Sequence, residues 1–133
     1  MSIGFFFFSL ATPVFYVQDF PSDVGLTILF LGWIGIFDGV FGWFANIFYA
    51  VAIILFLSGK KRFAFAISIL GALVALDSFR IRYTYHGDAS GTPFQSAYDI
   101  TAYGVGFYFW LSAMCLLPIG IYFSKDFTHK KLA

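Results

Sequence analysis

Long apolar runs follow one another along the chain, and short polar segments separate them. A helix needs about 20 apolar residues to cross a hydrocarbon core about 30 Å thick. The pattern predicts four membrane spans, over about residues 3–18, 42–58, 63–78 and 102–123. The first three are short, so each needs flanking residues or a locally thinned bilayer to cross. The fourth is long enough, although Pro118 should kink it or open its hydrogen-bond ladder.

The apolar segment 24–57 is too long to form one spanning helix. As a single helix it would extend about 50 Å at about 1.5 Å per residue, well beyond the bilayer. We expect a break at Asp38-Gly39 or at Gly42, because glycine weakens a helix and a carboxylate is costly at the bilayer centre. This break leaves an interfacial or re-entrant helix at about 24–37, before the second span. The alternative is a fifth span with the N-terminus outside, but the segment is short for one.

The sizeable polar region at about 79–101 is predicted to form a small external cap between the third and fourth spans. Its first part, FRIRYTY, alternates between apolar and polar side chains with the period of a strand. The sequences HGD and SGTP that follow supply turn residues. We expect a hairpin that packs on the helices, because a lone hairpin is marginally stable in water.

The composition indicates that most of the protein surface faces lipid. Hydrophobic residues make up 60% of the chain, aromatic residues 23% and charged residues only 11%, whereas soluble domains carry about a quarter charged residues. The predicted fold class is therefore an all-α integral membrane protein, a four-span helical bundle in one domain over residues 1–133. The net charge of +1 does not favour a nucleic-acid partner.

Basic residues predict the orientation of the spans. The run KKR lies at residues 60–62, after the second span, and three more lysines lie at 125, 130 and 131, after the fourth. Two spans separate these groups, so they lie on one side, and the positive-inside tendency places that side in the cytoplasm. We expect a bacterial inner (plasma) membrane location with both termini in the cytoplasm.

Three polar residues lie within or beside the predicted spans: Asp38, Asn46 and Asp77. Asp38 could be a proton or cation site, or a helix cap or turn at headgroup level, and the neighbouring glycines favour the turn. Asn46 is expected to form a hydrogen bond with a neighbouring helix. Asp77 and Arg80 are three residues apart, so they could pair on a continuing helix and fix the start of the cap.

Small residues predict close helix packing in two places. Gly35 and Gly39 have GxxxG spacing, and a stripe of small residues follows the third predicted span: Ala64, Ser68, Gly71, Ala72 and Ala75. Small side chains let helix backbones approach closely in membranes. We favour packing within one bundle, and a self-association face is the alternative.

Amphipathic aromatic residues gather near the expected outer interface. Tyrosine and tryptophan prefer the level of the lipid headgroups, so seven of them are expected to form an aromatic belt, mostly on the outer side: Trp33, Trp43, Tyr49, Tyr83, Tyr85, Tyr98 and Tyr103. Trp110 lies deeper in the fourth span and is expected to pack against other helices rather than to recognise a ligand.

No motif in the sequence indicates an enzyme or a cofactor. The chain lacks a P-loop, paired helix histidines, and a serine–histidine or cysteine–histidine arrangement on one side of the membrane. His86 and His129 fall on opposite sides of the membrane, and His86 with Asp88 and Asp99 has no metal-ligand spacing. We therefore expect a non-enzymatic protein with no cofactor and no bound metal.

These features favour a small membrane protein that acts by binding another membrane component, as an accessory subunit or an immunity-type protein. Its size and expected topology are similar in shape to immunity proteins for pore-forming bacterial toxins, although no motif carries this likeness. The expected contact surface is on the outer side: Arg80, Arg82, Tyr83, His86 and Asp88. Its partner would be a membrane protein, a second copy of the chain or membrane lipid. The alternative is a small oligomeric transporter or channel that uses Asp38 and Asn46, and the depth of Asp38 distinguishes the two.

Overall fold

The computed structural model describes residues 1–17, 23–86 and 96–129. Helices make up most of these parts of the chain. The five α-helices are α1 (Ser2–Leu10), α2 (Gly25–Leu31), α3 (Ala45–Leu57), α4 (Lys61–Leu76) and α5 (Val105–His129). Three short 3-10 helices extend or precede them: η1 (Gly32–Asp38), η2 (Gly42–Phe44) and η3 (Asp77–Arg80).

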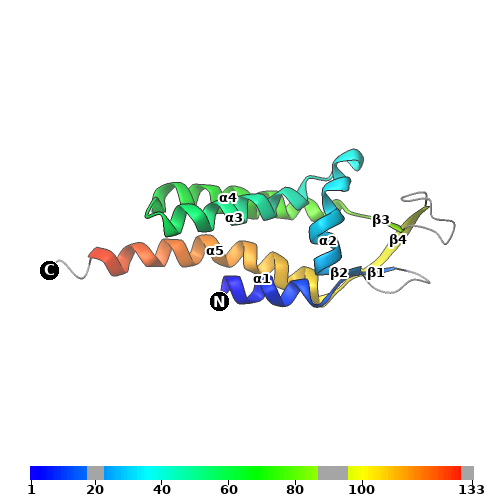
Figure 1. Ribbon diagram of the computed structural model, residues 1–133, viewed down its shortest axis with the longest axis horizontal. Coiled ribbons are helices and arrows are strands. Elements are labelled where there is room, and N and C mark those ends of the chain that lie inside the picture. Colours follow the sequence, from blue (N-terminus) through cyan, green and yellow to red (C-terminus); the bar gives the residue numbers. More distant parts are fainter. Residues whose placement is uncertain (18–22, 87–95, 130–133) are drawn as a thin grey trace.

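Four of the helices lie lengthwise beside one another (Figure 1). Helix α3 packs on α4, α4 packs on α5, and α5 packs on α1. The α3–α4 turn and the C-terminal part of α5 lie at one end of this bundle, which we call the basic end because of the run KKR at 60–62. Helix α2 crosses the opposite end, next to a small sheet (Figure 1). We call this second end the sheet end.

The sheet has four antiparallel strands in the order β2-β1-β4-β3. Their bounds are β1 (Pro13–Val17), β2 (Asp23–Val24), β3 (Tyr83–His86) and β4 (Ser96–Tyr103). The β3–β4 pair confirms the hairpin predicted within 79–101, with Tyr83 opposite Asp99. Strand β1 was not predicted, and it pairs with β4 through Phe15 and Tyr103. The protein is mostly helical, as expected, but the small sheet means that it is not all-α.

The first apolar run is not one helix, so the predicted span at 3–18 is wrong. Helix α1 ends at Leu10 and is only about 14 Å long at about 1.5 Å per residue. Pro13 ends it, because proline has no N–H and disfavours helical geometry at the residue before it. The Thr12 hydroxyl donates to the carbonyl oxygen of Phe8 over 3.0 Å, which binds the chain back onto α1 as it turns into β1.

The predicted break between 38 and 42 is confirmed. Helix η1 ends at Asp38, and Gly39 has φ +69°, a left-handed conformation that glycine adopts without a Cβ clash. The N–H of Val40 donates to the carbonyl oxygen of Gly35 over 3.0 Å, which satisfies one free carbonyl at the helix end. The helical conformation resumes at Gly42 with η2.

Two helices in the described ranges are long and apolar enough to cross a membrane. They cover Lys61–Arg80 and Val105–Ser124, and each is about 30 Å long at about 1.5 Å per residue. Helix α3 together with η2 is shorter, about 24 Å by the same rise. The four-span bundle is therefore not confirmed, because α1 and α3 are shorter than a typical bilayer core.

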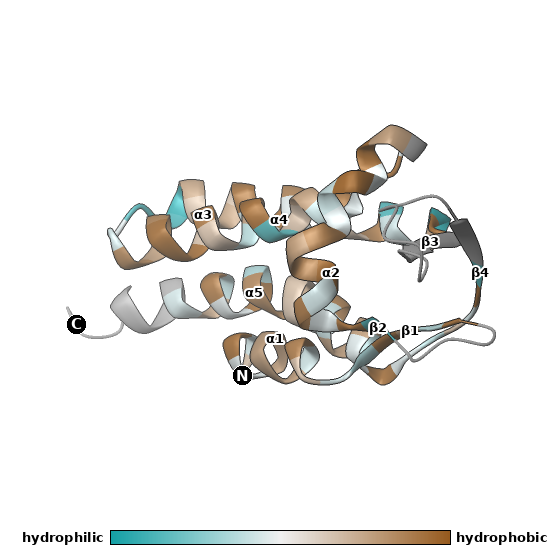
Figure 2. Cartoon of the chain, turned by 45° about the vertical axis from the view of Figure 1, so that its right-hand side comes forward, coloured by the Kyte–Doolittle hydropathy of each residue, from teal (hydrophilic) through white to brown (hydrophobic). Residues whose placement is uncertain are grey.

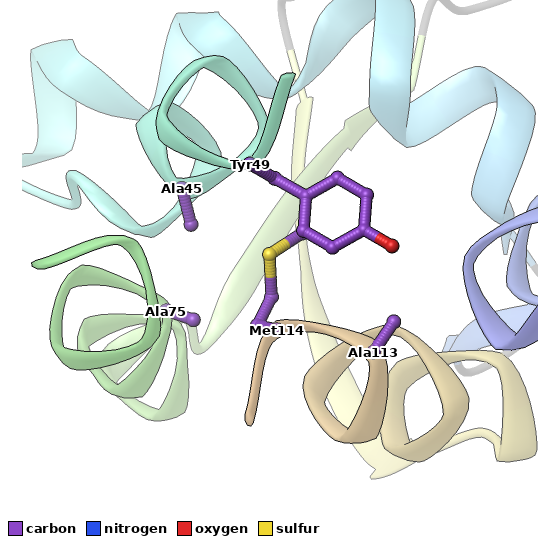
Figure 3. Close-up of a cluster of buried hydrophobic side chains, with 5 residues drawn as sticks. All are labelled: Ala45, Tyr49, Ala75, Ala113 and Met114. Atoms are coloured by element: carbon purple, nitrogen blue, oxygen red, sulfur yellow. The ribbon is translucent and has the colours of Figure 1, made fainter. Parts of the chain in front are cut away.

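Hydrophobic residues run along the bundle helices (Figure 2), and many of their large apolar side chains are exposed. On α4 the buried residues are Ala64, Ser68, Gly71 and Ala75, so this part of the predicted stripe packs within the bundle as favoured. The outward side chains of the same helix include Phe63, Leu70 and Leu73. Figure 3 shows the centre of the bundle, where Tyr49 of α3 and Met114 of α5 lie among three alanines: Ala45, Ala75 and Ala113.

We expect Gly71→Ala to destabilise the bundle, whereas Gly120→Ala should not. A Cβ on Gly71 of α4 would lie 2.9 Å from the Cβ of Phe48 on α3, but a Cβ on Gly120 of α5 has no atom within 4 Å. Both changes gain helix propensity, about 1 kcal/mol, so their difference isolates the clash. The clash should cost Gly71→Ala about 1–3 kcal/mol. Thermal unfolding in mild detergent, followed by circular dichroism, measures the difference. Equal midpoints for the two variants would contradict close α3–α4 packing.

Candidate functional site

Asp77 joins the end of α4 to the start of the helical segment that leads into α3. Its Oδ2 accepts the N–H of Phe41, at 2.7 Å, and its Oδ1 accepts a hydrogen bond from the Arg80 guanidinium, at 3.1 Å. Phe41 is the N-cap of η2, where free N–H groups favour a negative charge. Asp77 therefore caps a helix that has no side-chain cap of its own, and the predicted Asp77–Arg80 ion pair is confirmed.

Close contact between Gly42 and Ser78 holds the same junction together. Ser78 is buried, and a Cβ on Gly42 would overlap its side chain. Any larger residue at position 42 would push η2 away from η3 and lengthen the hydrogen bond between Phe41 and Asp77. The glycine that the sequence indicates as a break point is thus needed for a close approach between two segments.

Tyr103, at the end of β4, binds the chain segment that leaves α4. Its hydroxyl lies 3.1 Å from the carbonyl oxygens of both Phe79 and Ile81. Its ring lies against Phe107, with the centroids 4.6 Å apart. Burial raises the pKa of the Tyr103 phenol, and the positive charge of Arg82 opposes this rise. Tyr103 therefore fixes the distance between β4 and the segment that leads into β3.

A half-open hollow of about 360 Å³ lies between these two segments, at the sheet end. Residues 79, 81 and 82 line one side, and residues 99–103 line the other. Its lining residues include the apolar Phe79, Ile81 and Ile100 and the charged Arg82 and Asp99, and most of the exposed lining is polar. The Ile100 N–H donates to the carbonyl oxygen of Arg82 over 2.9 Å, so the contact between the two segments continues past the end of β3.

Asn46 forms a hydrogen bond inside the bundle, as predicted. Its Oδ1 accepts the indole N–H of Trp110 over 2.8 Å, which links α3 to α5. Trp110 also packs against buried clusters on both sides of this bond. The amide oxygen and the indole N–H thus satisfy each other within the bundle.

Asp38 lies in a different part of the molecule from Asn46. It ends η1, which projects away from the bundle helices at the sheet end (Figure 2). The neighbouring Phe37 is 80% exposed, and Gly39 has no atom within 4 Å of a hypothetical Cβ. The side chain of Asp38 lies outside the described part of the structure. Its backbone position matches a turn rather than a site between helices.

The predicted contact surface is only partly visible. Arg80 is 68% exposed despite its bond to Asp77, and Arg82 is also exposed. Tyr83 and His86 contribute backbone to β3, but their side chains lie outside the described residues, as does the whole of Asp88. The structure therefore brings the two arginines and the β3 backbone together at the sheet end.

The predicted aromatic belt needs one correction. Tyr49 is buried in the bundle, where its hydroxyl lies 2.7 Å from the Ser2 hydroxyl, so it packs between helices instead of facing the interface. Trp33 is exposed on η1. Trp43 donates its indole N–H to the carbonyl oxygen of Leu29 over 2.8 Å and thereby ties η2 to α2. The side chains of Tyr83, Tyr85 and Tyr98 are not among those described.

Two features of this site were missed in the sequence. One is the capping of Phe41 by Asp77. The only sequence signal for it was an aspartate placed directly after an apolar run, because the helix start that it caps lies far away in the sequence. The other is the bond from Tyr103 to Phe79 and Ile81, which no spacing rule indicates. Both join segments that are more than twenty residues apart.

The described residues contain no group of three histidine, cysteine or acidic side chains that could hold a metal ion. Comparisons with protein-family models, with curated proteins and with solved structures find no match for this chain. The geometry of the sheet end therefore carries the functional argument.

We expect Asp77→Ala to destabilise the protein more than Arg80→Ala does. Removing the carboxylate leaves the Phe41 N–H without its cap, a loss of about 1–2 kcal/mol. Removing Arg80 breaks only an exposed ion pair, worth less than about 1 kcal/mol. Asp77→Asn keeps one acceptor oxygen and should fall between them. Thermal unfolding in mild detergent gives the order, and an Arg80→Ala loss equal to that of Asp77→Ala would refute the capping role.

Proposed function

We propose that this chain is a small non-enzymatic polytopic membrane protein that binds another membrane component through its sheet end. It would act as an accessory subunit or an immunity-type protein. The observation that carries the proposal is the combination of an ordered sheet with exposed arginines and a bundle whose sides are covered with apolar side chains. Such a molecule offers its polar recognition groups at one end only.

The distribution of side-chain sizes supports a lipid environment. Exposed side chains on the bundle helices include Phe7 of α1, Ile54 of α3, Phe63 of α4 and Phe123 of α5. Contiguous apolar surfaces of this kind mark membrane or protein contacts. Small residues such as Ala52 on α3 and Gly71 on α4 are buried where helices meet, which is the packing expected between helices in lipid.

The bundle geometry supports the proposed orientation. The Lys61 ammonium lies 3.4 Å from the carbonyl oxygen of Ser124, so the run at 60–62 and the C-terminal part of α5 share the basic end. The positive-inside tendency places this end in the cytoplasm and the sheet end outside. Helix α1 does not reach the basic end, because Ser2 lies beside Tyr49 and Ala113 in the middle of the bundle.

The alternative function, a small oligomeric transporter or channel, has less support. Its pathway would include Asp38 and Asn46, but Asn46 is hydrogen-bonded to Trp110. Asp38 ends a helix that leaves the bundle, so the two residues do not share one track. A transport role would need a second copy of the chain to complete the path.

Cysteine labelling in intact cells tests the orientation. With Cys115 replaced by alanine, a single cysteine at position 82 should react with a membrane-impermeant maleimide, because Arg82 is exposed at the outer end. A single cysteine in place of Lys60 should react only after the membrane is permeabilised. Equal labelling of both in intact cells, or the reverse pattern, would contradict the orientation.

In-membrane photo-crosslinking tests the contact surface. A photoreactive amino acid in place of Arg80, which is 68% exposed, should give a discrete protein adduct in cells that express the chain at its natural level. The same residue in place of Lys60, exposed at the basic end, is the matched control and should give no such adduct. Lipid adducts alone at position 80, or identical protein adducts at both positions, would refute recognition through the sheet end.

A further inference from the structure

Strand β3 forms one edge of the sheet at the sheet end. The strand order β2-β1-β4-β3 places β4 on one side of it, and no other described strand pairs with its second side. Residues 83–86 pair with β4 in a regular antiparallel register, from Tyr83 opposite Asp99 to His86 opposite Ser96. The second side of β3 is therefore a free edge within the described part of the chain.

The register shows which backbone groups point to this free edge. The Ile100 N–H donates to the carbonyl oxygen of Arg82 over 2.9 Å, and these two residues lie opposite each other when the β3–β4 register is continued by one pair. Hydrogen-bonded and non-hydrogen-bonded pairs alternate along antiparallel strands. Every second residue after Arg82 therefore bonds to β4, and the backbone N–H and C=O groups of Tyr83 and Tyr85 point to the free edge.

The free edge lacks the features that protect an exposed strand. Folded proteins block edge strands with proline, lysine, a β-bulge or a covering segment. Residues 83–86 have the sequence YTYH, with no proline and no lysine. Their pairing with β4 is regular, whereas the pairings of β1 are irregular on both sides. Two outward donors and two outward acceptors, on residues about 7 Å apart, form a template for another strand.

The charge beside the edge and the orientation of the bundle indicate what pairs with it. Arg82 is exposed directly before β3, so an acidic residue of an added strand would be favoured next to it. Asp99 lies on β4, one strand further from the free edge. Antiparallel pairing between the β3 strands of two copies would place their bundles in opposite orientations, because β3 leads away from the bundle (Figure 1). The positive-inside tendency gives the chain one orientation, which disfavours a second copy.

We propose that β3 binds an extended segment of a partner protein, which adds to the sheet as a fifth strand. The segment exchanges backbone hydrogen bonds with Tyr83 and Tyr85, and one of its acidic residues faces Arg82. Main-chain hydrogen bonds supply the affinity in this mode of recognition. The inference rests on the function proposed above and names the means by which the sheet end holds its partner.

Amide hydrogen exchange tests the free edge without any partner. It is measured residue by residue with NMR on the purified full chain in detergent. The amides of Thr84 and His86 bond to β4, so their protection should exceed that of the Tyr83 and Tyr85 amides about tenfold. Equal protection at all four positions would show that the edge is already covered and would overturn the proposal.

Tyr85→Pro and Tyr85→Val test the recognition itself. Both remove the tyrosine side chain, but only proline lacks the outward N–H, and proline is tolerated where an edge strand's N–H points away from the sheet. Each variant carries the photoreactive residue at position 80 in cells, and thermal unfolding checks that both are folded. The protein adduct should fall about threefold or more in Tyr85→Pro relative to Tyr85→Val, because a backbone hydrogen bond is lost. Equal yields would overturn strand addition.

Arg82→Gln tests the charge on the partner segment, and Arg62→Gln is the matched control, an exposed arginine at the basic end. The adduct yield should fall about twofold to fivefold in Arg82→Gln, the range for an exposed ion pair, and stay unchanged in Arg62→Gln. No fall in Arg82→Gln, or an equal fall in both, would overturn the acidic contact.

The adduct at position 80 also separates this inference from the proposed function. An adduct with twice the mass of the chain would assign the edge to a second copy and overturn the proposal of a different partner protein. Absence of any protein adduct with the unaltered edge would refute the proposed function itself. Persistence of the adduct in Tyr85→Pro would refute only strand addition.

Discussion

Close approach between backbones is the constraint on which the rest of this structure depends. If lipid surrounds the bundle, as we propose, a helix gains little by burying leucine or phenylalanine, and van der Waals contact and hydrogen bonds must hold the helices together. Gly71 brings α4 onto Phe48 of α3, and Gly42 brings η2 onto Ser78. At the sheet end, Gly25 meets the backbone of Ser9, and Gly104 meets that of Pro13. Each close contact leaves the large side chains free to face outward.

Hydrogen bonds between distant segments satisfy polar groups that would lie in an apolar environment if the bundle spans a membrane, as we propose. Each unsatisfied polar group in lipid costs several kcal/mol. The Asp77 carboxylate accepts a hydrogen bond from the Phe41 N–H, and the Asn46 amide oxygen accepts one from the indole N–H of Trp110. Where the first apolar run stops being helical, β1 pairs with β4, so its backbone groups are satisfied by a strand that lies far away in the sequence.

Structural features that depend on one segment of the chain could be predicted from the sequence, whereas features that depend on contacts between distant segments could not. The break near Gly39, the hairpin at β3 and β4 and the buried face of α4 follow from local residue types and periods. The partner of β1 does not, because Pro13 ends α1 locally but nothing within PVFYV indicates that it pairs with β4.

The two aspartates nearest the apolar segments show how position, rather than residue type, decides a role. Asp38 follows an exposed helix and precedes a left-handed glycine, so the chain turns there away from the bundle. Asp77 follows a packed helix and lies against another helix start, so its charge is used between segments. Both are flanked by apolar sequence. A carboxylate in such a sequence therefore marks a functional site only when the fold leaves it without a structural partner inside the apolar region.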